Sequence, residues 1–115
     1  MPEIFQVDRV DRIIDILYGV ATGRATITYR KLAFRIGARP DNLGHPLERV
    51  SRRAVERGEP MWSALVVSAE TGTPGPAFYG QARRLRAEYR ELPDAEILRL
   101  ESDRCYALAM AARPA

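Results

Sequence analysis

The sequence contains one cysteine, one histidine and one lysine among its 115 residues. Cys105 has no partner for a disulfide within the chain, and Cys105 with His45 falls short of the clustered ligands of a zinc site. No apolar run approaches the roughly 18 residues that span a bilayer, and the opening residues lack the basic and then apolar layout of a secretory signal. We therefore expect a cytoplasmic protein with no metal, no cofactor and no membrane contact.

The composition is that of an ordinary globular protein. Hydrophobic residues make up 46% and charged residues 29% of the chain, unlike the polar, highly charged composition of disordered chains. A chain of this length also fits one hydrophobic core. We expect a single domain over residues 1–115, with a core over about residues 8–79 and a helical extension over about residues 80–112.

The basic residues gather in one part of the chain. The formal net charge is +3, but residues 24–57 hold nine basic residues against Asp41, Glu48 and Glu56, which gives this segment +6 and leaves the remainder at −3. Arginine accounts for 17 of the 18 basic residues, and its planar guanidinium group suits phosphate and guanine. Arginine-rich chains are also encoded by GC-rich genomes, so the position of the charge carries more weight than the residue type.

Hydrophobic spacing predicts five helices. They cover residues 7–22, 29–36, about 44–57, 81–91 and about 94–110. Thr28 is a good N-cap for the second helix, and Gly37 is expected to close it. In the last helix, Cys105 is expected to be a buried thiol.

Two short segments predict strands. Residues 25–29 are β-branched and too few for a helix, while the apolar run 64–68 follows Met61 and Trp62, which we expect in the core. The turn-rich segment 70–76 comes next, so we expect the second strand to form a β-hairpin, or wing. This order predicts a mainly α fold with a small β-hairpin, a winged helix-turn-helix core with C-terminal helices.

The third helix has one apolar side and one charged side. Leu43, Leu47, Val50 and Ala54 recur at intervals of four, three and four residues, so this side is expected to face the core. The residues expected to point outward are His45, Arg49, Arg52, Arg53 and Glu56.

Residues 27–78 contain a pattern similar to that of a known family. The run Thr28-Tyr29-Arg30-Lys31-Leu32-Ala33, with Gly37 eight residues after the tyrosine and Gly44 further on, resembles the DNA-binding domain of the alkylguanine-DNA alkyltransferases and their non-catalytic alkyltransferase-like relatives. The resemblance implies a winged helix that binds DNA, with Tyr29 in contact with a phosphate and Gly44 at the opening of the recognition helix. It covers under half of the chain.

The sequence departs from this family at the catalytic position. Ala64 falls where the family has its catalytic cysteine, and Leu65 and Val66 follow in place of histidine and arginine. Alkyl transfer needs an activated thiolate beside a base, so we expect binding without enzyme activity. The intercalating arginine of the family maps near Asp41, with Arg39 nearby as the candidate substitute. Segments 43–47, 58–60, 65–67 and 74–75 also resemble a group of short, uncharacterised bacterial proteins, and no function follows from that likeness.

Together these features predict a non-catalytic protein that binds double-stranded DNA. The recognition helix, about residues 44–57, would enter the major groove, while Tyr29, Arg30 and the loop 71–76 grip the backbone. The candidate DNA contacts are Tyr29, Arg30, Arg39, Asn42, His45, Arg49, Arg52 and Arg53.

Alternatives stay open for the same residues. The arginine side of the third helix could be a solvated surface partly neutralised by Glu48 and Glu56, and Tyr29 could pack its ring on the core. The basic face could also cover a protein partner, as in an immunity or antitoxin-like factor. The acidic remainder of the chain suits either homodimer contacts or solubility.

Overall fold

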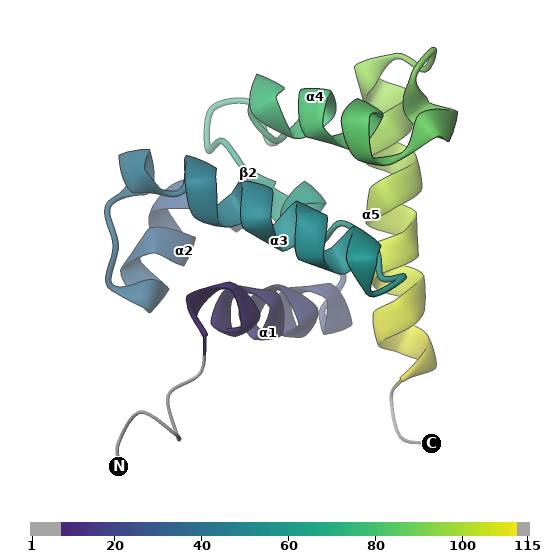
Figure 1. Cartoon of the computed structure of the whole chain (residues 1–115). Helices are drawn as coiled ribbons and strands as arrows, with labels where there is room; N and C mark the ends of the chain where they lie inside the picture. Colours follow the sequence, from purple (N-terminus) through teal and green to yellow (C-terminus); the bar gives the residue numbers. More distant parts are fainter. Residues whose placement is uncertain (1–7, 113–115) are drawn as a thin grey trace.

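Helices form most of the protein (Figure 1). The computed structural model describes residues 8–112, along which five α-helices, three 3-10 helices and two short strands follow one another. The α-helices are α1 (Arg9–Thr22), α2 (Tyr29–Ile36), α3 (Gly44–Glu56), α4 (Pro76–Leu85) and α5 (Asp94–Ala111). The mainly helical class expected from the sequence is confirmed.

Helix α1 begins and ends at local signals in the sequence. The Asp8 carboxylate accepts a hydrogen bond from the Val10 amide at 2.7 Å, and Gly23 follows the last helical residue. The apolar side, with Ile13 and Leu17 fully buried, packs against α3 and α5. The helix expected over residues 7–22 is therefore confirmed from residue 9 onward, and residue 7 lies outside the described residues.

Helix α2 has the capping residues that its sequence predicts. The Thr28 hydroxyl accepts a hydrogen bond from the Lys31 amide at 3.2 Å, which satisfies one of the free donors of the first turn. Gly37 ends the helix in the left-handed region at φ 71°, a conformation that favours glycine. The buried residues of α2 are Leu32, Ala33 and Ile36.

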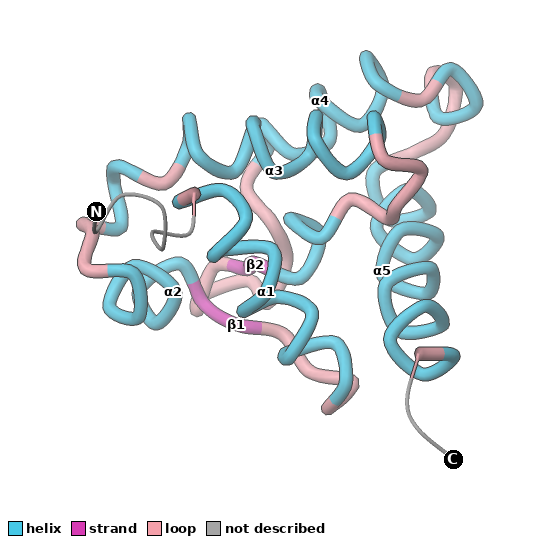
Figure 2. The backbone as a smooth tube through the Cα atoms, turned by 60° about the horizontal axis from the view of Figure 1, so that its bottom comes forward, coloured by secondary structure: helices cyan, strands magenta, loops and turns pink. Residues whose placement is uncertain are grey.

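The two strands lie side by side as a parallel pair (Figure 2). Ile27 of β1 (Ile27–Thr28) pairs with Val66 of β2 (Val66–Val67), 39 positions later in the chain. The expectation of a β-hairpin over residues 64–76 is wrong, because η3 (Trp62–Leu65) takes up the start of the apolar run and leaves two extended residues. Parallel strands need a crossover connection, and here α2 and α3 supply it.

The segment after β2 is a turn that leads directly into a helix. The Ser68 amide donates to the Thr73 carbonyl at 2.9 Å, and the Gly72 amide donates to the Ser68 carbonyl at 2.8 Å. Pro76 then occupies the start of α4, a position where a missing N–H leaves no helical bond unmade. Within residues 8–112, β2 consequently has β1 as its strand partner and no returning strand that would form a wing.

The first C-terminal helix was expected over residues 81–91 and differs from that expectation at both ends. Helix α4 begins at Pro76 instead of residue 81 and ends at Leu85, because Arg86 adopts an extended conformation before the short η4 (Ala87–Tyr89). Helix α5, expected over about residues 94–110, is confirmed as Asp94–Ala111. Within residues 8–112, no helix combines the length and the apolar character needed to cross a membrane.

Helix α3 lies between α1 and α4, with η3 packed against its inner side (Figure 1). Trp62 of η3 is 2% exposed, and its ring centroid lies 5.8 Å from that of Tyr18 on α1. Met61 and Cys105 are also completely buried. The core positions expected for these residues are confirmed.

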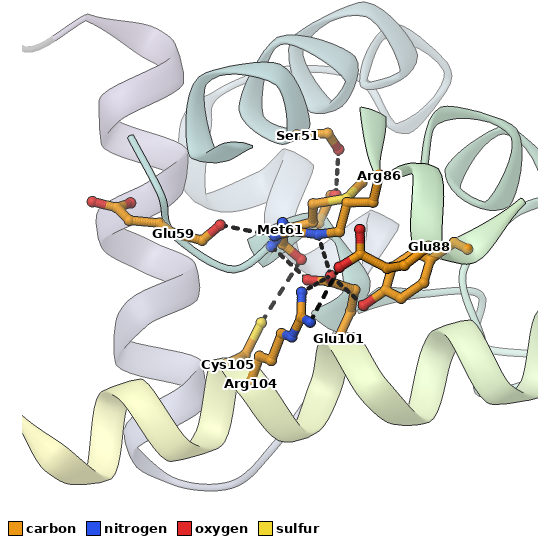
Figure 3. A network of polar contacts seen from close by, with 10 residues as sticks. Ser51, Glu59, Met61, Arg86, Glu88, Glu101, Arg104 and Cys105 are labelled. Carbon is orange, nitrogen blue, oxygen red and sulfur yellow. Dashed lines mark hydrogen bonds and ion pairs between the residues drawn. The ribbon is translucent and has the colours of Figure 1, made fainter. Parts of the chain in front are cut away.

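The side chain of Glu101 on α5 is completely buried and joins three segments (Figure 3). Its carboxylate accepts hydrogen bonds from the Met61 amide at 2.9 Å and from the Tyr89 hydroxyl at 2.6 Å. Arg86 and Arg104 form ion pairs with the same carboxylate. This network fastens α5 to η4, to the end of α4 and to the loop before η3, and so holds the elements that pack against α3.

Candidate nucleic-acid interface

An exposed stripe of polar side chains runs along the outer side of α3. It consists of His45, Arg49, Arg52 and Glu56, which recur at intervals of four, three and four residues. We call this set the α3 stripe. All four side chains are exposed, while the opposite side of the helix is buried in the core. The outward positions expected for these residues are confirmed, and α4 and α5 leave them accessible.

Arg53 lies apart from the α3 stripe, on the side of the helix that faces α1. Its guanidinium group forms ion pairs with the Asp8 and Asp11 carboxylates, both at 3.2 Å, and Arg57 pairs with Asp11 at 3.1 Å. A hydrogen bond from the Val10 amide, together with Arg53, lowers the pKa of Asp8. Only 24% of the Arg53 side chain is exposed. The outward position expected for Arg53 is therefore corrected, since its charge joins α3 to α1.

Two further candidate contacts are paired with carboxylates close by in the sequence. Arg52 lies 3.1 Å from Glu48, and Arg39 lies 3.3 Å from Asp41, all of them well exposed. Such exposed pairs contribute little to stability, so an incoming phosphate could replace the carboxylate. Asn42, at the end of η2 (Pro40–Asn42), is exposed as well.

The outer side of α2 holds basic charge that is not neutralised internally. Its exposed residues are Arg30, Lys31, Phe34 and Arg35. We call these four residues the α2 face. Within residues 8–112, no carboxylate lies within ion-pair distance of its three cations.

Of the four residues of the α2 face, the sequence singled out Arg30 alone. The signal for the other three was present in the spacing of Leu32, Ala33 and Ile36, because an apolar side of that spacing turns the remaining residues outward. The short element η2 contacts both α2 and α3, so the α2 face and the α3 stripe belong to adjoining parts of the molecule.

Tyr29 packs on the core, which is one of the two roles that the sequence left open. Its half-buried ring packs against the core, and its hydroxyl oxygen accepts a hydrogen bond from the Gly75 amide at 2.7 Å. This bond ties the start of α2 to the start of α4. Because a hydroxyl can accept and donate at once, the Tyr29 proton is left to donate to an acceptor such as a phosphate oxygen.

The position of the alkyltransferase cysteine, Ala64, and the cysteine that the chain does contain, Cys105, are both buried. Ala64, at the place of the alkyltransferase cysteine, is 1% exposed within η3. Burial, reinforced by Glu101, raises the pKa of the Cys105 thiol, which keeps it protonated at neutral pH. His45 is exposed on α3, and among the described residues no group of histidine, cysteine and carboxylate side chains is arranged to hold a metal ion.

The structure sorts the basic residues of segment 24–57 by their partners. Those paired with carboxylates are Arg39, Arg52, Arg53 and Arg57. Arg24 lies over the Tyr106 ring, 5.0 Å from its centroid. The cations of the α2 face and Arg49 remain, which within residues 8–112 are exposed and have no carboxylate partner. Comparison of the chain with protein-family models, with curated proteins and with solved structures finds no match.

Proposed function

We propose that the protein binds double-stranded DNA without changing it chemically, through the α2 face and the α3 stripe. The observation that supports this is the set of four exposed cations, Arg30, Lys31 and Arg35 on α2 and Arg49 on α3, without a carboxylate partner among the described residues. Unpaired cations on one part of a surface are the electrostatic footprint of a nucleic-acid-binding protein.

Phosphate contacts supply most of the affinity in this proposal. Helix α3 is flanked by α1 and α4. In this proposal only the ends of the side chains in the α3 stripe enter a groove of the DNA, so we expect modest sequence selectivity. Each phosphate that is neutralised lowers the slope of log K against log salt by about 0.9. About four such contacts predict that affinity falls roughly 100-fold between about 50 and 200 mM salt.

A fluorescence anisotropy titration of a labelled duplex at these two salt concentrations tests the proposal. Replacing both Arg35 and Arg49 with glutamine is expected to weaken binding and to reduce the magnitude of the salt slope by about 1.8. Replacing both Arg84 and Arg90 with glutamine is the matched control, because both are exposed and lie outside the two surfaces. Absence of binding at low salt, or an equal loss in the control, would contradict the proposal.

A protein partner is the second candidate. The observation that favours it is Phe34, which is 86% exposed at the centre of the α2 face, because exposed aromatic side chains often anchor protein interfaces. A partner that co-purifies stoichiometrically, together with no retention on duplex DNA at low salt, would favour this candidate over the first.

A further inference from the structure

Phe34, at the centre of the α2 face, exposes its aromatic ring to solvent. Phe34 is 86% exposed, whereas the other phenylalanine and tryptophan side chains among residues 8–112 are buried. Together with Ile27, Arg30, Lys31 and Arg35 it lines an open hollow of about 530 Å³. Leaving a phenyl ring in water forgoes the free energy of burying it, so this position gains from a partner that covers it.

Three cations line the same hollow as the ring. Arg30 precedes Phe34 by four residues and Lys31 by three, spacings that place side chains next to one another on a helix, and Arg35 follows directly. Helix α2 contains no acidic residue. The hollow therefore brings together the exposed ring of Phe34, the apolar Ile27 of β1 and three cations.

This combination fits one kind of ligand in particular. A nucleotide within a strand offers a flat base, which stacks on an aromatic ring, and phosphates on both sides of it, which pair with cations. The hollow also lies within the range of about 300–1,000 Å³ that small-molecule-sized groups occupy. Bases inside an intact duplex already stack on their neighbours, so the base must be unpaired.

We propose that the α2 face binds an unpaired nucleotide, with the base stacked on Phe34 and the flanking phosphates at Arg30, Lys31 and Arg35. The proposal rests on the proposed function and narrows its substrate to DNA that contains a gap, a bulge or a single-stranded segment. Stacking on Phe34 makes binding selective for DNA with an unpaired base over intact duplex, whereas the cations supply affinity for both.

The test compares two labelled DNAs, a perfect duplex and the same duplex with a short single-stranded gap, in anisotropy titrations. Phe34→Ala is expected to weaken binding of the gapped DNA about tenfold, within the range measured for loss of one stacked base, and to change binding of the perfect duplex less than about twofold. Met110→Ala is the control, because Met110 is an exposed apolar residue on α5, 50% exposed, and neither affinity is expected to change. Circular dichroism checks that both variants are folded.

Phe34→Trp provides a second readout. A base that stacks on the new indole is expected to quench its emission when the gapped DNA is added, above the steady signal of the buried Trp62. The perfect duplex is expected to leave the emission nearly unchanged. Equal quenching by both DNAs would show that the indole emission responds to any nearby DNA and not to a stacked base, which overturns the proposal.

The outcomes distinguish base stacking on Phe34 from the binding of double-stranded DNA proposed above. Equal binding of the two DNAs, unaffected by Phe34→Ala, would reject base stacking and leave duplex binding intact. No binding of either DNA at low salt would reject both proposals. Displacement of the gapped DNA by polyglutamate, with Phe34→Ala weakening polyglutamate binding to the same degree, would identify the surface as a site for acidic proteins instead.

Discussion

Replacing Glu101 with glutamine is expected to destabilise the protein strongly while nearly preserving the side-chain volume. The Glu101 carboxylate is fully buried and accepts hydrogen bonds from Met61 and Tyr89. It is also the counter-ion of Arg86, whose side chain is only 15% exposed. The substitution removes the negative charge and leaves a largely buried cation without its partner.

The size of the effect follows from the cost of an uncompensated buried charge. Breaking a buried pair by removing one member lowers stability by about 3–5 kcal/mol, which is a large part of the roughly 5–15 kcal/mol that stabilises a typical domain. At roughly 4 °C per kcal/mol for a chain of this size, the Tm is expected to fall by about 12–20 °C. Partial unfolding at 37 °C would be a visible consequence.

Thermal unfolding followed by circular dichroism measures this shift. Glu96→Gln is the matched control, because Glu96 lies on the same helix and pairs with Arg99 at the surface, and we expect its Tm to stay close to that of the unmodified protein. Adding Arg86→Met to Glu101→Gln is expected to restore part of the lost stability, since the unpaired cation is then gone. A Tm for Glu101→Gln equal to that of Glu96→Gln, or no recovery in the double variant, would refute the reasoning.

Three further expectations concern local features. Thr28→Ala removes the N-cap of α2 and is expected to lower the free energy of unfolding by about 1 kcal/mol in urea titrations, whereas Thr71→Ala, in an exposed turn, is expected to have a smaller effect. Arg53→Gln is expected to lower the Tm more than Arg49→Gln, because Arg53 pairs with Asp8 and Asp11; equal shifts would contradict the structural role given to Arg53. Burial, with the hydrogen bond to Glu101, raises the pKa of Tyr89 above its ordinary 10.0, so the unfolded state loses this proton first and stability is expected to fall as the pH rises above about 10. The fall should be less steep in Tyr89→Phe, and identical alkaline profiles would show that Tyr89 does not contribute.

Local signals in the sequence were sufficient to predict where α1, α2, α3 and α5 lie. Thr28 and Gly37 act within one turn of the helix that they delimit, so their effect does not depend on the remainder of the chain. The start of α4 was missed because Pro76 occurs in a run of turn-forming residues, where proline is as typical of a loop as of a first helical turn. The exposed positions of the α3 stripe were predicted from the same helical spacing that predicted the apolar side of α3.

Long-range relations could not be predicted in this way. The pairing of β1 with β2 depends on the positions of both strands after α2 and α3 have packed, and two-residue strands have no distinctive pattern. The contact of Arg53 with Asp8 and Asp11 depends on how α1 lies against α3, which neither helix encodes separately. Glu101 lies four residues from both Ile97 and Cys105, the spacing of the buried side of α5. A glutamate is buried only where partners meet it, and the Met61 amide and the Tyr89 hydroxyl that do so come from distant parts of the chain.

The parallel pairing of β1 with β2 bears on how the protein folds. Bringing Ile27 beside Val66 closes a long loop for a gain of only two residue pairs, and the chain entropy lost in that closure precedes any gain. Helix α3, inside the loop, packs against α1, α4 and η3, which offers more contacts than the strand pair, so we expect the strands to join late in folding. Helix α2 contacts both strands, whereas α3 is held by α1, α4 and η3, so local opening of the strand pair is expected to loosen the α2 face and to leave the α3 stripe in place.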